Sequence, residues 1–335
     1  MDGNAARKLE AIDLIKLYGV IQYQWDLRRD SINWRGPINK LLSPETPLIS
    51  GSSFNNTLDS NNFWLRLQAL TQATVENPTF TVKYNLCLPN YHHCYVEEKG
   101  EVLYGSDGTP LGIEGDIRFL DNDREIPPSR PLSGYDKLTG FSEKEVSVET
   151  LISYLEQSQL SGIPGAYIVV TIDQLTLFAC QNGLKATENL IRETTEAVRH
   201  AIRFNDFMGK TSSCCFGIVL KDCDRWGIIR AADRLISAAQ AMKIKTESGL
   251  EIKVSISLGG IVFPNEQMDA PKIMQKAERY LFEAQSIKGG NVAGTPYSTR
   301  TEPDLERPAD GHKHGKRRSR DISKITDIAP EEARA

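Results

Sequence analysis

The cysteines are the residues of this sequence with the widest range of chemistry, because a thiol can ligate a metal, form a disulfide or attack a substrate. There are six: Cys87, Cys94, Cys180, Cys214, Cys215 and Cys223. They are scattered, and none forms the CxxC spacing that is typical of a zinc site. A disulfide scaffold would need more cysteines in a shorter chain. We therefore expect buried or partly buried thiols, with Cys214 and Cys215 on opposite faces of a strand.

The bulk composition is that of a soluble, cytoplasmic, globular protein. A length of 335 residues predicts two domains. With 40% hydrophobic and 25% charged residues, the chain is not expected to be disordered as a whole. It has no apolar run long enough to span a membrane and no signal peptide. A net charge of −4 gives no general attraction to nucleic acid.

The first part of the chain is predicted to be an amphipathic helix within residues 1–18, followed by an α+β domain at 19–123. The apolar face of the helix packs on the next domain or, alternatively, on a parallel dimer partner. In the α+β domain a helix is expected near 62–76. Alternation and turn signals predict an antiparallel sheet beside it, with strands at 20–25, 32–34, 80–86, 94–98 and 111–117.

The second part predicts an α/β domain at 134–293, after a proline-rich linker at 124–133. Its strands are expected at 166–170, 216–220 and 252–258, and its helices at 184–201, 226–242 and 270–286. Residues 294–335 have a basic cluster among Pro, Gly, Ser and acidic residues, and we expect a disordered tail. A solvated tail is favoured over contact with nucleic acid or anionic lipid.

Three sequence blocks in the second part resemble a known family. Asp136–Phe141 (DKLTGF) resembles the D-x-L-T-G-L opening of GGDEF domains, and Ser255–Gly259 (SISLG) resembles their late S-[IL]-G strand. Ala277–Gln285 (AERYLFEAQ) is similar to their closing helix. The resemblance implies a diguanylate cyclase fold, a nucleotide cyclase-like palm with a central, mainly antiparallel sheet.

The first part resembles a PAS sensory domain. The similarity lies in residues 19–26, 95–100 and 107–110. The two parts together resemble alphaproteobacterial-type signalling proteins in which PAS and GGDEF domains precede an EAL phosphodiesterase domain. No EAL domain is present in this sequence.

The residues that the GGDEF family uses for catalysis are replaced here. Such enzymes join two GTP molecules into cyclic di-GMP with divalent cations, so the carboxylates that hold the metal are essential. The position of the signature loop falls on Ser212, Ser213, Cys214, Cys215 and Phe216. Serines replace both glycines, cysteines replace both acids, and only the phenylalanine is kept.

Other positions of the implied nucleotide site have changed as well. Thr171 stands for a metal-binding aspartate, although Asp173 remains, and Ala179 stands for the guanine-reading asparagine, although Glu188 remains. Gln285 replaces a phosphate-binding lysine. Mg²⁺ prefers oxygen ligands, so we expect no metal site. The loss of several groups that act as one catalytic unit removes nearly all of the rate, so we expect no cyclase activity.

One implied ligand site is retained. Arg203 and Asp206 match the R-x-x-D site at which the family binds cyclic di-GMP as an inhibitory product. A guanidinium fork suits guanine O6 and N7 or a phosphate, and a carboxylate accepts from the guanine N1 and N2 amines. The alternative is a local ion pair between residues three apart.

These residues favour a catalytically inactive PAS–GGDEF protein that binds cyclic di-GMP at Arg203 and Asp206 or relays a sensed signal to a protein partner, as a homodimer. We expect no other cofactor, and the sequence does not identify a PAS ligand. The alternatives are an interaction or dimerisation scaffold that binds no nucleotide and, third, an active diguanylate cyclase.

Overall fold

A computed structural model describes two folded parts of the chain. The described residues are 19–36, 50–55, 57–88, 92–120, 138–140, 144–212, 215–245, 251–264 and 268–286. The helix predicted within 1–18, the linker at 124–133 and the tail at 294–335 lie outside them. We call residues 19–120 the N-terminal domain and residues 144–286 the C-terminal domain. All of them belong to one compact unit.

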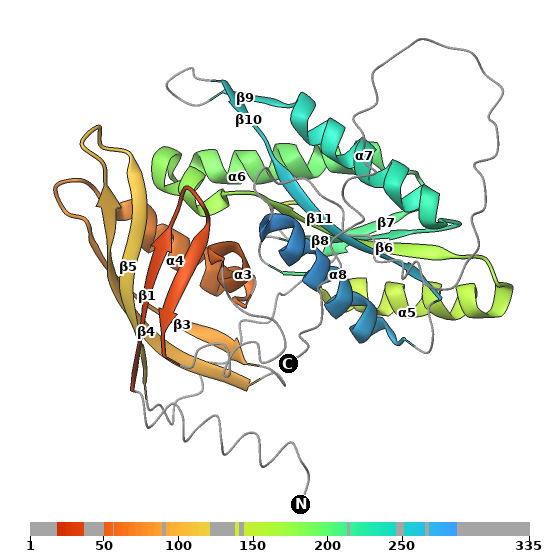
Figure 1. Cartoon of the computed structure of the whole chain (residues 1–335), viewed down its shortest axis with the longest axis horizontal. Coiled ribbons are helices and arrows are strands. Elements are labelled where there is room, and N and C mark those ends of the chain that lie inside the picture. Colours follow the sequence, from red (N-terminus) through yellow and green to blue (C-terminus); the bar gives the residue numbers. More distant parts are fainter. Residues whose placement is uncertain are drawn as a thin grey trace, which may run out of the picture. The chain divides into compact units, whose positions relative to one another are not determined.

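In its described residues the N-terminal domain is a five-stranded antiparallel sheet with two helices (Figure 1). The strands follow the order β2-β1-β5-β4-β3. Their bounds are β1 (Val20–Asp26), β2 (Ser31–Arg35), β3 (Thr79–Leu88), β4 (His92–Tyr104) and β5 (Pro110–Phe119). The helices are α3 (Gly51–Asn55) and α4 (Ser60–Gln72). The α4 helix begins where the Asp59 carboxylate accepts the amide hydrogen of Asn62 at 2.8 Å, which caps its first turn.

Alternation along the strands produces the core of this domain. Ile21, Tyr23 and Trp25 of β1 are each at most 2% exposed, while the residues between them face outward. They form one hydrophobic cluster with Phe63 and Leu67 of α4. One face of the sheet is therefore buried under the helices.

The C-terminal domain is built on the antiparallel sheet β11-β6-β8-β7. The bounds of these strands are β6 (Gly165–Ile172), β7 (Phe207–Lys210), β8 (Cys215–Leu220) and β11 (Ile256–Phe263). Two short strands, β9 (Lys243–Lys245) and β10 (Glu251–Lys253), form a separate pair. The helices are α5 (Lys144–Ser161), α6 (Leu175–Ala201), α7 (Arg225–Ala241) and α8 (Ala270–Ser286).

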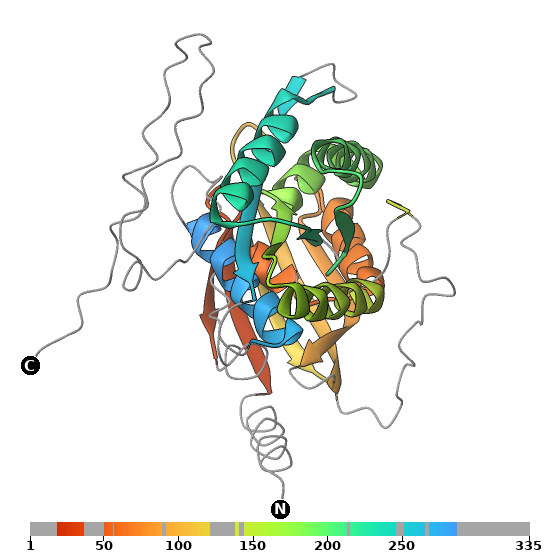
Figure 2. The same ribbon diagram turned by 90° about the vertical axis from the view of Figure 1, so that its right-hand side faces the viewer.

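Helices cover both faces of this sheet (Figures 1 and 2). Along β6 every residue is buried: Ile168 and Val170 pack with α6 and α7, and Tyr167 and Val169 pack with α5 and α8. A strand buried on both faces reads as a continuous apolar run, which is what residues 166–170 are. None of the described helices is both long and apolar enough to cross a membrane.

The structure differs from the expected elements at several boundaries. α4 ends at Gln72 and not near residue 76, because Ala73 is already extended on the way to Pro78. The strand expected at 252–258 is divided, since β10 pairs with β9 whereas β11 pairs with β6. The helix expected at 184–201 is the second segment of α6. Gly183, at φ 78° and ψ 173°, interrupts the helix and separates the two segments.

Candidate functional site

The end of β6 brings together several positions that the sequence assigned to the nucleotide site. Thr171 pairs with Cys215 on β8 and with Ser257 on β11, so the three lie side by side across the sheet. Thr171 and Cys215 are 1% and 2% exposed. The Cys215 side chain belongs to the apolar cluster under α5 and α8. A buried thiol in apolar surroundings suits packing and does not suit metal binding.

Asp173, the retained acid, is held by the protein itself. Its amide donates to the Ser255 carbonyl at 2.9 Å, and its carboxylate accepts the Ser255 hydroxyl at 2.6 Å. Burial raises the pKa of Asp173, against the opposing effect of hydroxyl and amide groups on Ser255, Ser257 and Gln285. The groups that act on this carboxylate are therefore neutral, and they include Gln285, at the position where the resemblance implies a lysine.

The turn between β7 and β8 is where the resemblance places the signature loop. Its two central residues, Ser213 and Cys214, lie outside the described residues. On either side of them, the amides of Thr211 and Ser212 donate to the Cys215 carbonyl at 3.0 and 3.3 Å. Phe216 is 4% exposed and packs in the core shared with α6 and α7. The described part of the turn is thus a close connection between two antiparallel strands.

The retained acid Glu188 is exposed on α6, and Ala179 on the same helix is completely buried. Among the described contacts, none joins Glu188 to Asp173. The described residues also contain no group of three or more His, Cys, Asp and Glu that could hold a metal ion. Glu188 and Asp173 are thus separate acids among the described contacts, and the expectation that this domain holds no metal stays a prediction.

The Arg203–Asp206 segment forms a tight turn directly after α6. The Asp206 amide donates to the Arg203 carbonyl at 3.1 Å. The two carboxylate oxygens of Asp206 accept the backbone amides of Arg203 at 3.0 Å and of Lys221 at 3.2 Å. Asp206 therefore fixes the turn against the end of β8. A carboxylate has about four lone-pair sites, so it can still accept from a ligand.

The side chain of Arg203 is exposed beside this turn. Within the described residues it has no ion pair, so the local pair with Asp206 that was the alternative reading is not formed. Arg203 and Asp206 line one pocket together with Lys221, Cys223 and Arg234. Arg234, on α7, donates from Nε to the Ala201 carbonyl at the end of α6, at 3.2 Å.

Arg234 is a site residue that the sequence reasoning missed. It lies on a helix that was predicted, but no local pattern distinguishes it from the other arginines of that helix. Two exposed aromatic residues are neighbours of the pocket residues in sequence. Phe204 is fully exposed between Arg203 and Asp206, and Trp226 is 46% exposed beside Gly227. The pocket thus offers two guanidinium groups and a carboxylate to an anionic ligand.

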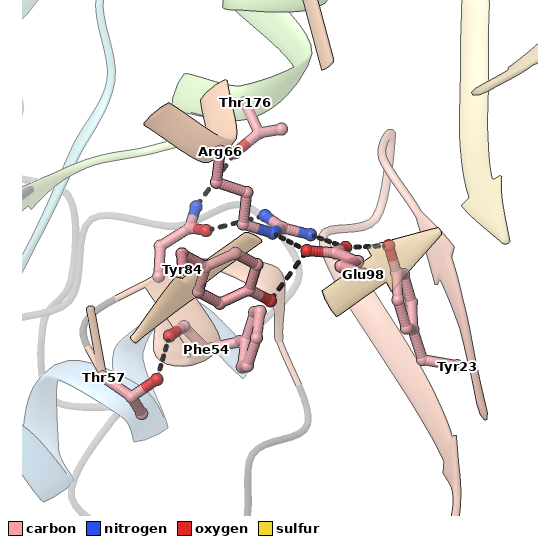
Figure 3. Close-up of polar contacts among 8 residues, drawn as sticks. Tyr23, Phe54, Thr57, Arg66, Tyr84, Glu98 and Thr176 are labelled. Carbon is pink, nitrogen blue, oxygen red and sulfur yellow. Dashed lines mark hydrogen bonds and ion pairs between the residues drawn. The ribbon is translucent and has the colours of Figure 1, made fainter. Parts of the chain in front are cut away.

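A second polar cluster lies inside the N-terminal domain (Figure 3). The Arg66 guanidinium makes a two-point contact with Glu98, at 2.8 Å from Nε and 2.9 Å from Nη2. The hydroxyls of Tyr23 and Tyr84 donate to the same carboxylate. Arg66 is 2% exposed and Glu98 is completely buried. This charge pair was not predicted, although each residue falls on the inward face of its element.

The comparisons with known proteins concern the C-terminal part of the chain. Residues 133–291 match the family described as "Diguanylate cyclase, GGDEF domain". Diguanylate cyclase DosC of Escherichia coli K12 is 23% identical over 157 residues, which are 47% of this chain and 34% of DosC. The uncharacterised protein YhcK of Bacillus subtilis is 24% identical over 159 residues, 47% of this chain and 44% of YhcK. The match thus spans about a third of the length of DosC.

Solved structures give the same kind of match. The GGDEF domain of DgcB from Caulobacter crescentus, determined in complex with cyclic di-GMP, aligns with a TM-score of 0.46 at 14% identity. The alignment covers 50% of this chain and 97% of that domain. Diguanylate cyclase SiaD of Pseudomonas aeruginosa, determined with its activator SiaC, aligns with the same TM-score at 16% identity over 49% of this chain and 62% of SiaD.

Proposed function

Because residues 133–291 are a GGDEF domain, we propose that this protein acts in the cyclic di-GMP network as a receptor that does not synthesise the dinucleotide. The observation that carries the receptor role is the exposed Arg203 guanidinium in one pocket with Asp206 and Arg234. Two guanidinium groups can meet guanine edges or phosphates, and Asp206 can accept from the guanine amines. Asp206 also holds the turn that presents Arg203.

The proposed loss of synthesis rests on the chemistry of the β6 edge. Thr171 and Cys215 stand where the resemblance implies acids, and both are buried. Asp173 is engaged by neutral donors, and no metal-binding group occurs in the described residues. Two triphosphates would bring a large negative charge, and the acids that would hold neutralising divalent cations are replaced at these two positions.

We also propose that the N-terminal domain, within residues 19–123, is a PAS domain that supplies the input. Its antiparallel sheet with packed helices is the α+β arrangement that the PAS resemblance implies. The output would be contact with a second copy of the chain or with a protein partner. If no nucleotide binds, the scaffold alternative replaces the receptor, and the titration below separates the two.

Calorimetric titration with cyclic di-GMP is expected to show binding by the wild-type chain and a loss of about 10–100-fold for Arg203→Ala, because a charge-assisted hydrogen bond disappears. Arg192→Ala is the matched control. Arg192 is also an exposed arginine at the α6 side, where it donates to Asn189, and it does not line the pocket. No heat from the wild-type chain, or equal affinity of the Arg203 variant, would refute the receptor role.

Incubation of the purified chain with GTP and Mg²⁺ is expected to yield no cyclic di-GMP. The physical reason is the absence of acids at Thr171 and Cys215. Catalytic groups that act together are not additive, so the loss of one of them removes most of the rate. Anion-exchange chromatography of the products provides the measurement, with an active diguanylate cyclase in parallel as the positive control. A cyclic di-GMP peak that grows with the concentration of this chain would contradict the proposal.

A further inference from the structure

The beginning of α6 is contacted by separate segments of the N-terminal domain. The Gln174 side chain, at the start of the helix, donates from Nε2 to the Arg28 carbonyl at 2.9 Å. Two residues further on, in the first turn of α6, the Thr176 hydroxyl accepts from Nδ2 of Asn55, the last residue of α3, at 2.9 Å. Asn55 and Thr176 are each 3% exposed, so water is excluded from their contact. These contacts form a joint between the two domains.

The joint continues as a chain of hydrogen bonds into the N-terminal core (Figure 3). While its amide nitrogen donates to Thr176, the amide oxygen of Asn55 accepts from Arg66 Nη1 at 3.2 Å. Arg66 in turn is paired with Glu98, which also receives the Tyr23 hydroxyl. Thr176 is therefore the C-terminal-domain end of a polar chain that reaches β1 and β4. Buried polar groups of this kind are costly when they lose a partner.

Two features of the joint, a strained backbone conformation and a repulsion between carboxylates, oppose the contact that its hydrogen bonds make. Gln174 has φ 55° and ψ 29°, a left-handed conformation that residues with a Cβ rarely adopt, and its side chain is the one that reaches Arg28. Burial raises the pKa of Asp30 to about 6, and the charge of the nearby Asp173 adds to this rise. Two carboxylates, one from each domain, therefore repel each other when both are charged.

The joint also covers the α6 face on which the resemblance places the guanine-reading position. Ala179 on this face is completely buried. Its neighbour Cys180 lies close to the N-terminal domain: burial raises the pKa of Cys180 to about 12, and the charge of Arg66 opposes this rise. Ala179 is therefore closed to a base in this arrangement of the domains.

We propose that the hydrogen-bond chain from Glu98 through Arg66 and Asn55 to Thr176 is a releasable latch, by which the N-terminal domain covers the first segment of α6. The partner of this surface is the chain's own N-terminal domain. In the latched state the α6 face beside Asp173 is closed. Loss of the Asn55–Thr176 contact opens it, which gives the N-terminal domain a direct way to change the exposed surface of the GGDEF domain. This holds whether or not cyclic di-GMP binds.

Thiol labelling of Cys180 in the full-length chain tests the latch, with mass spectrometry reporting each cysteine separately. Thr176→Val keeps the shape of the side chain and leaves the buried Asn55 amide without its acceptor, so we expect Cys180 to be labelled about tenfold faster. Asn55→Ala should have the same effect from the other side of the joint. Thr187→Val is the matched control, because Thr187 is equally buried on α6 but donates within the helix, to Gly183, at 2.8 Å.

Cys223 serves as the internal reference. It is buried in the C-terminal domain and lines the Arg203 pocket, not the joint. Faster labelling of Cys180 with unchanged labelling of Cys223 supports the latch. An unchanged Cys180 rate in both Thr176→Val and Asn55→Ala would overturn it. An equal rise at Cys180 and Cys223 would overturn it too, because Thr176 would then support the whole domain and not the joint.

Discussion

Glu98→Gln is expected to lower the free energy of unfolding by about 3–5 kcal/mol, the usual cost of breaking a buried charge pair from one side. The Glu98 carboxylate accepts from Arg66, Tyr23 and Tyr84 and faces only donors. A glutamine amide would turn its own N–H groups toward these donors, and Arg66 would stay buried without a counter-ion. Burial alone would raise the pKa of Glu98, but Arg66 and the tyrosine hydroxyls outweigh it and lower that pKa, so the pair is charged at neutral pH.

Denaturant unfolding followed by tryptophan fluorescence measures this loss. Three of the four tryptophans, Trp25, Trp34 and Trp64, lie in the N-terminal domain, so the signal reports mainly on it. Glu97→Gln is the control one position away on β4. Its carboxylate is paired with Lys83 and Lys99 at the surface, and its loss is expected to leave the midpoint unchanged. Equal midpoints for the Glu98 variant and the wild type would contradict the proposed importance of the pair.

The sequence contained a signal for this charge pair that strand and helix patterns make visible. On α4, Arg66 occupies the same helical stripe as the buried Phe63, Leu67 and Leu70. On β4, Glu98 lies two residues after the buried Val96 and therefore on the same, inward face of the strand. A cation and an anion at two inward positions of neighbouring elements predict a buried pair. Neither residue was predicted to be part of such a pair.

Elements with strong periodicity were predicted well, and the GGDEF domain was confirmed by the family match at residues 133–291. The buried run of β6 and the alternation of β1 are examples.

The α5 helix was not predicted. Its apolar face, with the buried Leu151 and Leu155, is interrupted by the buried Ser147 and Ser158, whose hydroxyls donate to the carbonyls of Lys210 and Ile163. This helix is held to the sheet by the packing of Leu151 and Leu155 together with the Ser147–Lys210 hydrogen bond.

Local sequence patterns could not predict the contacts between segments that are distant in the chain. Asn55 and Thr176 are separated by 121 positions, and each is an ordinary polar residue in its own segment. Whether such a residue is solvated or buried depends on which surfaces meet, and hydrophobic periodicity carries no information about that. Arg234 reaches the Arg203 pocket for the same reason, through the packing of α7 against the end of α6. Motif spacing found Arg203 and Asp206 because both lie within one turn.

The close approach of β11 and α8 at Gly259 predicts a large loss of stability when this residue gains a side chain. Gly259 is the glycine of the SISLG block, and a Cβ at this position would overlap the carbonyl oxygen of Ala277 and the amide nitrogen of Leu281. Both atoms belong to the backbone of α8, so neither can turn away as a side chain would. Ala277 and Leu281 are also buried in the cluster that joins α8 to the sheet. The helix would have to move off the sheet and give up this packing.

Gly259→Ala is therefore expected to destabilise the C-terminal domain by about 3 kcal/mol or more, measured by thermal unfolding with far-ultraviolet circular dichroism. Gly260→Ala is the matched control on the opposite face of the same strand. A Cβ at Gly260 would first meet the end of the flexible Ile228 side chain at 2.8 Å, which can shift, so the loss should be clearly smaller. Equal losses for the two variants would mean that β11 tolerates a methyl group equally on both faces, and the backbone contact between Gly259 and α8 would then not determine the packing of this helix.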